Sequence, residues 1–103
     1  MQEKVKEFND SLTIHKTPMP ISARLLDISS ELGELNKEYL KATKYGTQNF
    51  THSQDFELEF GDVLYSLFCL ANETGIDAET ALDKVLEKYK NRANKNQSIG
   101  NDK

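Results

Sequence analysis

The sequence has a single cysteine, no apolar run long enough to cross a membrane and no apolar segment at its start. One cysteine, Cys69, cannot form an internal disulfide, and its apolar neighbours indicate a buried structural thiol. The first seven residues are mostly charged or polar and lack the core of a secretory signal. No stretch approaches the roughly 18 apolar residues of a transmembrane helix. These absences predict a cytoplasmic protein that does not act at a membrane.

Several catalytic motifs are also missing. The sequence has neither the Gly-x-Ser-x-Gly turn of a serine hydrolase nor a Gly-x-x-x-x-Gly-Lys-Ser/Thr phosphate-binding loop. Histidine never stands three positions after a glutamate, which excludes the Glu-x-x-His pairs of a di-iron bundle. His15 and His52 fall in or near predicted loops and are interpreted as ordinary surface residues. Any phosphate must therefore be bound by metal and by scattered basic side chains.

The net charge at pH 7 is -4 over 103 residues. An acidic chain is a poor candidate for general binding to nucleic acids or anionic membranes. The charge does not argue against a phosphorylated small molecule that arrives with metal ions. A chain of this length predicts one domain with one core, and the small size of that core favours assembly into oligomers.

Apolar residues recur at helical spacing in four segments, which predicts an all-α protein. The first helix is expected over residues 2–12, and Thr17-Pro18-Met19-Pro20 interrupts the pattern after it. The second is expected over residues 22–44, with Gly46 of Tyr45-Gly46 as its left-handed cap. The apolar stripe of this second helix consists of Ile28, Leu32, Leu35 and Tyr39.

The third helix is expected to begin near Thr51 or Ser53 and to end at Gly75, and Asp77 is placed to cap a fourth. The third helix is the most apolar and is expected to be the most buried; its stripe holds Phe56, Phe60, Val63, Leu67 and Leu70. The fourth is expected to direct inward Ala81, Leu82, Val85, Leu86 and Tyr89. Residues 1–93 form the predicted domain, and residues 94–103 a polar, flexible tail.

Two short acidic motifs stand out in the middle helices, Glu31-Leu32-Gly33-Glu34 and Glu59-Phe60-Gly61-Asp62. Three residues are about one helical turn, so both acids of a motif project from one face. If the two helices pack together, four carboxylates converge. Two carboxylates about 5 Å apart repel by about 3 kcal/mol at an effective dielectric of about 20. A bound cation would relieve this repulsion, and oxygen ligands select Mg²⁺, with Mn²⁺ as a substitute.

The acidic motifs also admit a simpler interpretation as solvated helix faces, and three features weigh against it. A glycine within each motif costs about 1 kcal/mol relative to alanine, which suggests close helix approach or room beside the acids. Glu59 and Asp62 have no basic residue within a helical turn. The acids border the apolar stripes at Leu32 and Val63, where a cation would be shielded from water.

In order and spacing, the two motifs resemble the Glu-Glu-x-x-Glu and Glu-x-x-Asp signature of MazG-type nucleotide pyrophosphohydrolases, in the all-α NTP pyrophosphatase superfamily. The resemblance covers residues 21–92. It departs at Ser30, where the family has a glutamate, and this departure affects a supporting or proton-accepting role at that position rather than metal binding. The resemblance implies a four-helix MazG-like bundle protomer that assembles into a homodimer or homotetramer.

The resemblance further implies Mg²⁺-dependent hydrolysis of a nucleoside triphosphate between the α- and β-phosphates, giving the monophosphate and pyrophosphate. It also implies that four acids bind the metal and take part in catalysis, namely Glu31, Glu34, Glu59 and Asp62.

Positive charge for the pyrophosphate is expected on one face of the fourth helix, from Lys84, Lys88 and Arg92, although a solvated basic face is an equal alternative. Tyr45, Phe50 and Tyr65 could stack on a base, and Tyr65 also suits the core. Two other functions stay open. The first is hydrolysis of phosphoribosyl-ATP. The second is a non-catalytic helical interaction module, which Ser30 and the polar tail favour.

Overall fold

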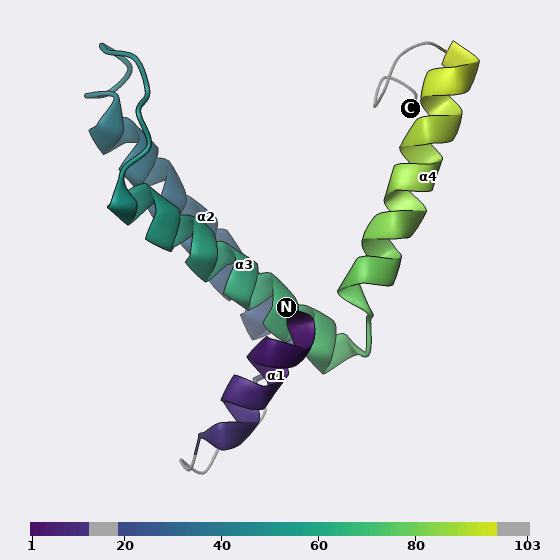
Figure 1. Ribbon diagram of the computed structural model, residues 1–103. Helices are drawn as coiled ribbons and strands as arrows, with labels where there is room; N and C mark the ends of the chain where they lie inside the picture. Colours follow the sequence, from purple (N-terminus) through teal and green to yellow (C-terminus); the bar gives the residue numbers. More distant parts are fainter. Residues whose placement is uncertain (13–18, 97–103) are drawn as a thin grey trace.

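The computed structural model describes residues 1–12 and 19–96, and the regular elements in this part of the chain are all helices, without strands. Figure 1 shows the four helices, which are α1 (Gln2–Ser11), α2 (Ile21–Ala42), α3 (Gln54–Thr74) and α4 (Ala78–Asn96). The all-α prediction is confirmed. His15 and residues 97–103 of the expected tail lie outside the described residues, and α4 continues three residues past position 93.

The boundaries of α3 and the start of α4 follow from capping residues that the sequence identifies. Ser53 is the N-cap of α3, and its hydroxyl accepts a hydrogen bond of 3.0 Å from the backbone N–H of Phe56. Gly75 ends α3 in the left-handed conformation, at φ 73°. Asp77 then accepts a hydrogen bond of 3.1 Å from the backbone N–H of Thr80 in the first turn of α4. These three predictions are confirmed.

The end of α2 differs from the prediction. The helix stops at Ala42 rather than running to residue 44, because Lys44 and Tyr45 have positive φ values of 48° and 59°, which a right-handed helix does not allow. The Thr43 hydroxyl donates to the carbonyl of Tyr39 and accepts from the N–H of Gly46, both at 3.0 Å. Gly46 has a positive φ as expected, but it follows the helix end by several residues instead of capping it.

The core lies along the antiparallel pair of α2 and α3, with α1 packed against α3 (Figure 1). The buried residues of α3 are Val63, Ser66, Cys69 and Ala71. Helix α3 is therefore the most buried element, as its composition predicts. Cys69 is only 1% exposed and accepts a hydrogen bond of 3.4 Å from the side-chain amide of Asn9, which confirms a buried thiol.

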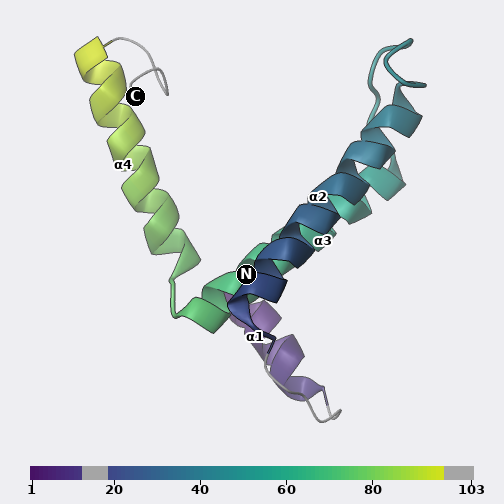
Figure 2. The same ribbon diagram turned by 180° about the vertical axis from the view of Figure 1, so that it is seen from behind.

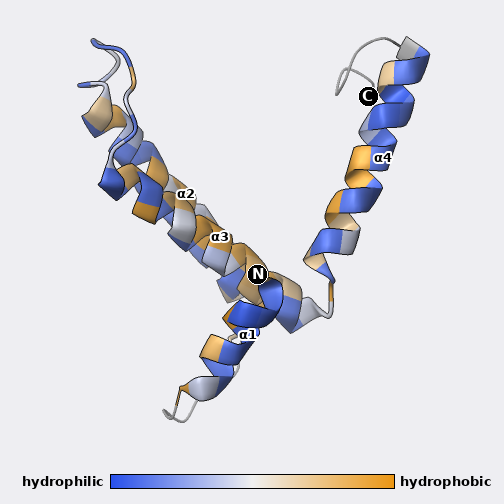
Figure 3. Ribbon diagram, in the orientation of Figure 1, coloured by the Kyte–Doolittle hydropathy of each residue, from blue (hydrophilic) through white to orange (hydrophobic). Residues whose placement is uncertain are grey.

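Helix α4 leaves the other helices and forms the second arm of a V, which both views of the ribbon show (Figures 1 and 2). It forms no packed helix pair with α1, α2 or α3. The expectation that its apolar stripe faces inward is wrong for Leu82 and Leu86, which are 56% and 53% exposed within this chain. Figure 3 shows orange, apolar bands along α4 among the blue, hydrophilic ones.

The start of α4 is held by one side chain of α1. The side-chain amide of Gln2 donates to the side chain of Asn72 at 2.9 Å and to the carbonyl of Ile76 at 2.7 Å. The side-chain oxygen of Gln2 accepts from the backbone N–H of Ala78 at 2.7 Å. This contact joins α1 to the α3–α4 connection. None of the helices in the described ranges combines the length and apolarity needed to span a membrane.

Candidate metal centre

Three carboxylates meet on the exposed side of the seam between α2 and α3. Glu59 and Asp62 lie three residues apart on α3, and antiparallel packing places Glu31 of α2 opposite them. One carboxylate oxygen from each of the three residues lies within 4.8 Å of the others. Elsewhere in residues 1–12 and 19–96, no other such group of histidine, cysteine, aspartate or glutamate side chains occurs.

Glu34, the fourth acid of the two motifs, stands beside this group rather than within it. Its carboxylate lies 3.8 Å from the ammonium of Lys37 on the same helix, a pairing that the sequence suggests. The charge of Glu34 nevertheless contributes to the raised pKa of both Glu31 and Glu59. The structure thus brings three of the four acids together and leaves the fourth close by.

The electrostatics of the cluster oppose full ionisation. Partial burial is the main cause that raises the pKa of Glu31, followed by the negative charges of Asp62, Asp27 and Glu34. Partial burial likewise raises the pKa of Glu59, followed by the charge of Asp62. Among the residues that the structure describes, no basic side chain lowers the pKa of Glu31 or Glu59 again. The cluster therefore gains from any cation that enters it.

Gly33 and Gly61 leave open space beside the acids. A methyl group added at either position would meet no atom within 4 Å. Within this chain neither glycine is therefore required by a close contact with the facing helix, which was one of the two roles expected of it. The glycines leave room that a larger ligand could use. Ser30, where the acidic signature departs, is exposed at the surface of α2.

The basic residues expected to bind pyrophosphate lie on α4, away from the acids (Figure 1). Lys84, Lys88 and Arg92 share one face of α4 and line a shallow hollow along it. The Lys88 ammonium lies 5.5 Å, and the Arg92 guanidinium carbon 5.9 Å, from the ring centroid of Tyr89. Within one chain, these cations and the carboxylates belong to different arms of the V.

The aromatic candidates for base stacking have other partners. Tyr65 donates a hydrogen bond of 2.6 Å to the side-chain oxygen of Asn9 and contacts the ring of Phe8 edge-on at 6.4 Å. It thus joins α3 to α1. Phe50 stacks on Tyr39, with ring centroids 5.4 Å apart, and packs edge-on against Phe56 at 5.0 Å. Tyr45 is exposed in the connection between α2 and α3.

His52 is exposed, and its Nε2 atom lies 3.6 Å from a carboxylate oxygen of Glu57, which agrees with its interpretation as a surface residue. Three residues that the acidic motifs do not include, Asp27, Ser66 and Arg24, continue the polar contacts between α2 and α3 beyond the cluster. Asp27 lies one turn before Glu31, and the Ser66 hydroxyl bonds to it across the helix pair at 3.0 Å. The sequence contains a signal for these residues, because they lie three or four residues from each other or from an acid of the motifs and so share its helix face.

Comparison with known proteins gives two matches. The model of the MazG nucleotide pyrophosphohydrolase domain family matches residues 20–96. The uncharacterized protein YpjD of Bacillus subtilis (strain 168) is 38% identical over 77 residues, which cover 74% of this chain and 67% of YpjD. No solved structure matches the chain. The matched family region contains α2, α3 and α4, and therefore all of the acidic and basic candidate residues.

Proposed function

The chain belongs to the MazG nucleotide pyrophosphohydrolase domain family, and on this premise we propose that it hydrolyses a nucleoside triphosphate between the α- and β-phosphates. The products are a nucleoside monophosphate and pyrophosphate. The observation that carries the proposal is the group of carboxylates formed by Glu31, Glu59 and Asp62 on the seam of α2 and α3.

The donor set fits a hard divalent cation. All three groups offer carboxylate oxygens, which suit Mg²⁺ or Mn²⁺ and not the softer metals that prefer histidine or cysteine ligands. Burial and, after it, the negative charge of neighbouring acids raise the pKa of Glu31 and Glu59, and a bound cation would offset the charge repulsion. We propose that these three residues hold Mg²⁺, with Glu34 contributing charge and a further oxygen from the same face of α2.

Bound Mg²⁺ would supply positive charge against the phosphate oxygens and favour deprotonation of a water molecule. The chain itself supplies a proton acceptor. Glu31, Glu34 and Glu59 each place a carboxylate in or beside the cluster, and one of these glutamates would accept the proton of the attacking water. Gly33 and Gly61 add no side-chain bulk within the two acidic motifs.

The basic face of α4 would complete the site from a second copy of the chain. Lys84, Lys88 and Arg92 carry the positive charge that pyrophosphate requires, but they lie on the other arm of the V. Leu82 and Leu86 expose apolar surface on the same helix, which favours burial against a partner. We therefore propose a homodimer or homotetramer in which α4 of one copy reaches the acids of another.

A panel of nucleoside triphosphates incubated with the protein and Mg²⁺ tests this function. The proposal predicts release of pyrophosphate and monophosphate, and no release of orthophosphate. Glu59→Gln should lower kcat by about 100-fold or more. Glu57→Gln is the matched control, because this exposed acid lies on the same helix outside the cluster.

Three outcomes would contradict the proposal. Orthophosphate release would place cleavage at a different bond. Hydrolysis of phosphoribosyl-ATP without hydrolysis of free triphosphates would identify the narrower activity. No hydrolysis of any substrate, together with no carboxylate-dependent binding of Mg²⁺, would favour a helical interaction module.

A further inference from the structure

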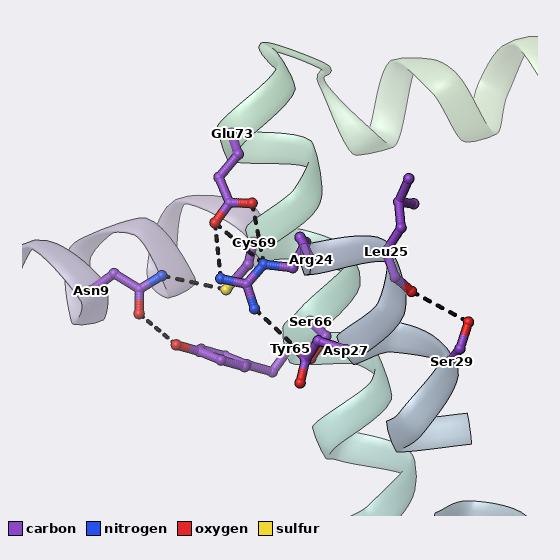
Figure 4. Close-up of polar contacts among 9 residues, drawn as sticks. All are labelled: Asn9, Arg24, Leu25, Asp27, Ser29, Tyr65, Ser66, Cys69 and Glu73. Atoms are coloured by element: carbon purple, nitrogen blue, oxygen red, sulfur yellow. Dashed lines mark hydrogen bonds and ion pairs between the residues drawn. The ribbon is translucent and has the colours of Figure 1, made fainter. Parts of the chain in front are cut away.

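The acidic cluster is the middle of a longer polar seam between α2 and α3. Toward one end of the helix pair, positions spaced three and four residues apart continue the acidic faces of both helices. These additional residues are hydrogen-bonded to one another rather than left as unpaired charges (Figure 4). On α2 they are Asp27 and Arg24, and on α3 they are Ser66 and Glu73.

Arg24 provides the positive charge for this end of the seam. Its Nε and Nη2 atoms donate to the two carboxylate oxygens of Glu73, at 3.1 Å and 2.8 Å. Its Nη1 atom donates to Oδ2 of Asp27 at 3.3 Å. The Arg24 side chain is only 13% exposed, so these bonds form where water competes weakly. One guanidinium thus bonds to two carboxylates and offsets part of their negative charge.

Asp27 therefore has a different environment from Glu31, although the two acids lie one turn apart on α2. Oδ2 of Asp27 accepts from both Arg24 and the hydroxyl of Ser66, the latter at 3.0 Å. Asp27 is not a member of the close carboxylate group. Without these two donors, the carboxylate of Asp27 would be free to turn toward Glu31 and compete with the acids of the cluster for a cation.

The Ser66–Asp27 hydrogen bond also runs parallel to the contact between Asp62 and Glu31. Ser66 lies four residues after Asp62 on α3, and Asp27 lies four residues before Glu31 on α2. Because the helices are antiparallel, a slide of one helix along the other would break the hydrogen bond and separate the acids together. Ser66 is only 3% exposed, which gives its hydroxyl little freedom to find another partner.

We propose that Ser66 and Arg24 are positioning residues: they hold Asp27 out of the carboxylate cluster and fix the register of α2 against α3, so that Glu31 and Asp62 stay at cation-binding distance. This inference rests on the proposed function, because it assigns the arrangement to the binding of a divalent cation. It concerns residues that do not themselves touch the cation or the substrate.

The test is the affinity of the nucleotide-free protein for Mn²⁺, measured by electron paramagnetic resonance, with thermal unfolding recorded in parallel. Ser66→Ala should weaken Mn²⁺ binding about 10-fold, the lower end of the effect of removing a group that orients a ligand directly, because Ser66 acts through Asp27 and the helix register. Ser29→Ala is the matched control, because the Ser29 hydroxyl bonds at 3.3 Å to the Leu25 carbonyl of its own helix (Figure 4). This control should bind Mn²⁺ with unchanged affinity.

Asp27→Asn provides a second variant that keeps an oxygen for Ser66 to bond and removes the negative charge. If the hydrogen bond from Ser66 fixes the register, Asp27→Asn keeps that bond and should change the Mn²⁺ affinity by less than about threefold. The double variant Asp27→Ala with Ser66→Ala should bind no more weakly than Ser66→Ala alone, since both substitutions remove one interaction. Asp27→Asn would overturn the inference by weakening Mn²⁺ binding as much as Ser66→Ala does, because Asp27 would then act as a ligand.

Failure of the inference and failure of the proposed function give different results. If Ser66→Ala melts at a lower temperature but binds Mn²⁺ like the unsubstituted chain, Ser66 is only structural and the inference alone is wrong. If the unsubstituted chain binds no Mn²⁺, or binds it equally well after Glu59→Gln, the proposed metal centre is wrong and the inference falls with it.

Discussion

Glu31 on α2 and Asp62 on α3 present carboxylate oxygens within 4.8 Å of each other across the helix pair, and Glu59 completes the group. Folding therefore brings negative charges together, and burial with charge repulsion raises the pKa of Glu31 and Glu59 above the ordinary value of 4.5. This charge repulsion has a direct consequence for the stability of the metal-free protein.

The first prediction concerns pH in the absence of metal. Because the folded state binds the Glu59 proton more tightly than the unfolded state does, this residue makes the free energy of unfolding fall as pH rises above about 4.5. Glu59→Gln removes that effect, so the variant should be more stable than the unsubstituted protein near neutral pH. The difference should shrink toward low pH, where Glu59 is protonated in both the folded and the unfolded chain.

Thermal unfolding across a pH series, with a chelator present, measures this difference. Glu57→Gln serves as the control and should not show it. Added Mg²⁺ should stabilise the unsubstituted protein at neutral pH and have little effect on Glu59→Gln. A Glu59→Gln variant that is less stable at neutral pH than the unsubstituted chain would mean that Glu59 is stabilised, not strained, by its surroundings.

The second prediction concerns the open space at Gly61. Alanine fits an α-helix better than glycine does, and a methyl group at this position meets no atom within 4 Å, so Gly61→Ala should stabilise the metal-free protein by about 1 kcal/mol. Urea unfolding measures the change. Gly75→Ala gives the opposite control, because φ at Gly75 is 73° and a side chain is strained there. Destabilisation by Gly61→Ala would show that the space is already filled, for example by another chain.

Local features of this fold follow well from sequence. The caps at Ser53, Gly75 and Asp77 depend on hydrogen bonds within three or four residues, so the residue type predicts them. The same locality places the two acids of each motif on one face of a helix.

Contacts between distant segments were harder to predict. The bond from Arg24 to Glu73 spans 49 positions, and nothing in either neighbourhood specifies the other partner. The apolar stripe at Leu82 and Leu86 correctly indicates a surface that favours burial, but periodicity does not state against which element. This is why the divergence of α4 was missed. One hint in the sequence was Ser66, a polar residue on an apolar helix, whose hydroxyl needs a hydrogen-bond partner and finds it on the neighbouring helix.

The third prediction addresses assembly. Leu82 and Leu86 lie one turn apart on α4 and are both more than half exposed, so replacing both with serine should weaken association between copies. Sedimentation velocity should show smaller particles than for the unsubstituted protein. Asp83→Ser, on the same helix, is the control and should leave the particle size unchanged. If the double variant sediments like the unsubstituted protein, α4 is not the surface through which copies associate.

The fourth prediction tests whether α4 of one copy serves the acids of another. A chain with Glu59→Gln lacks one acid of the cluster, and a chain with Lys88→Gln and Arg92→Gln lacks two of the three basic residues. Each variant should be nearly inactive alone. Mixed and allowed to exchange, they should recover part of the pyrophosphate release, because some sites then combine intact acids with intact cations. Absence of recovery, despite exchange shown by labelled chains, would place both groups in the same copy.

The position of a bound Mn²⁺ ion tests the central claim most directly. Crystals grown with Mn²⁺ and a non-hydrolysable triphosphate give anomalous scattering that locates the ion without assumptions about its ligands. The account predicts a peak between α2 and α3, about 2.1 Å from carboxylate oxygens of Glu31, Glu59 and Asp62. A nucleotide complex in which the ion lies elsewhere, with these carboxylates turned away from the triphosphate, would contradict it.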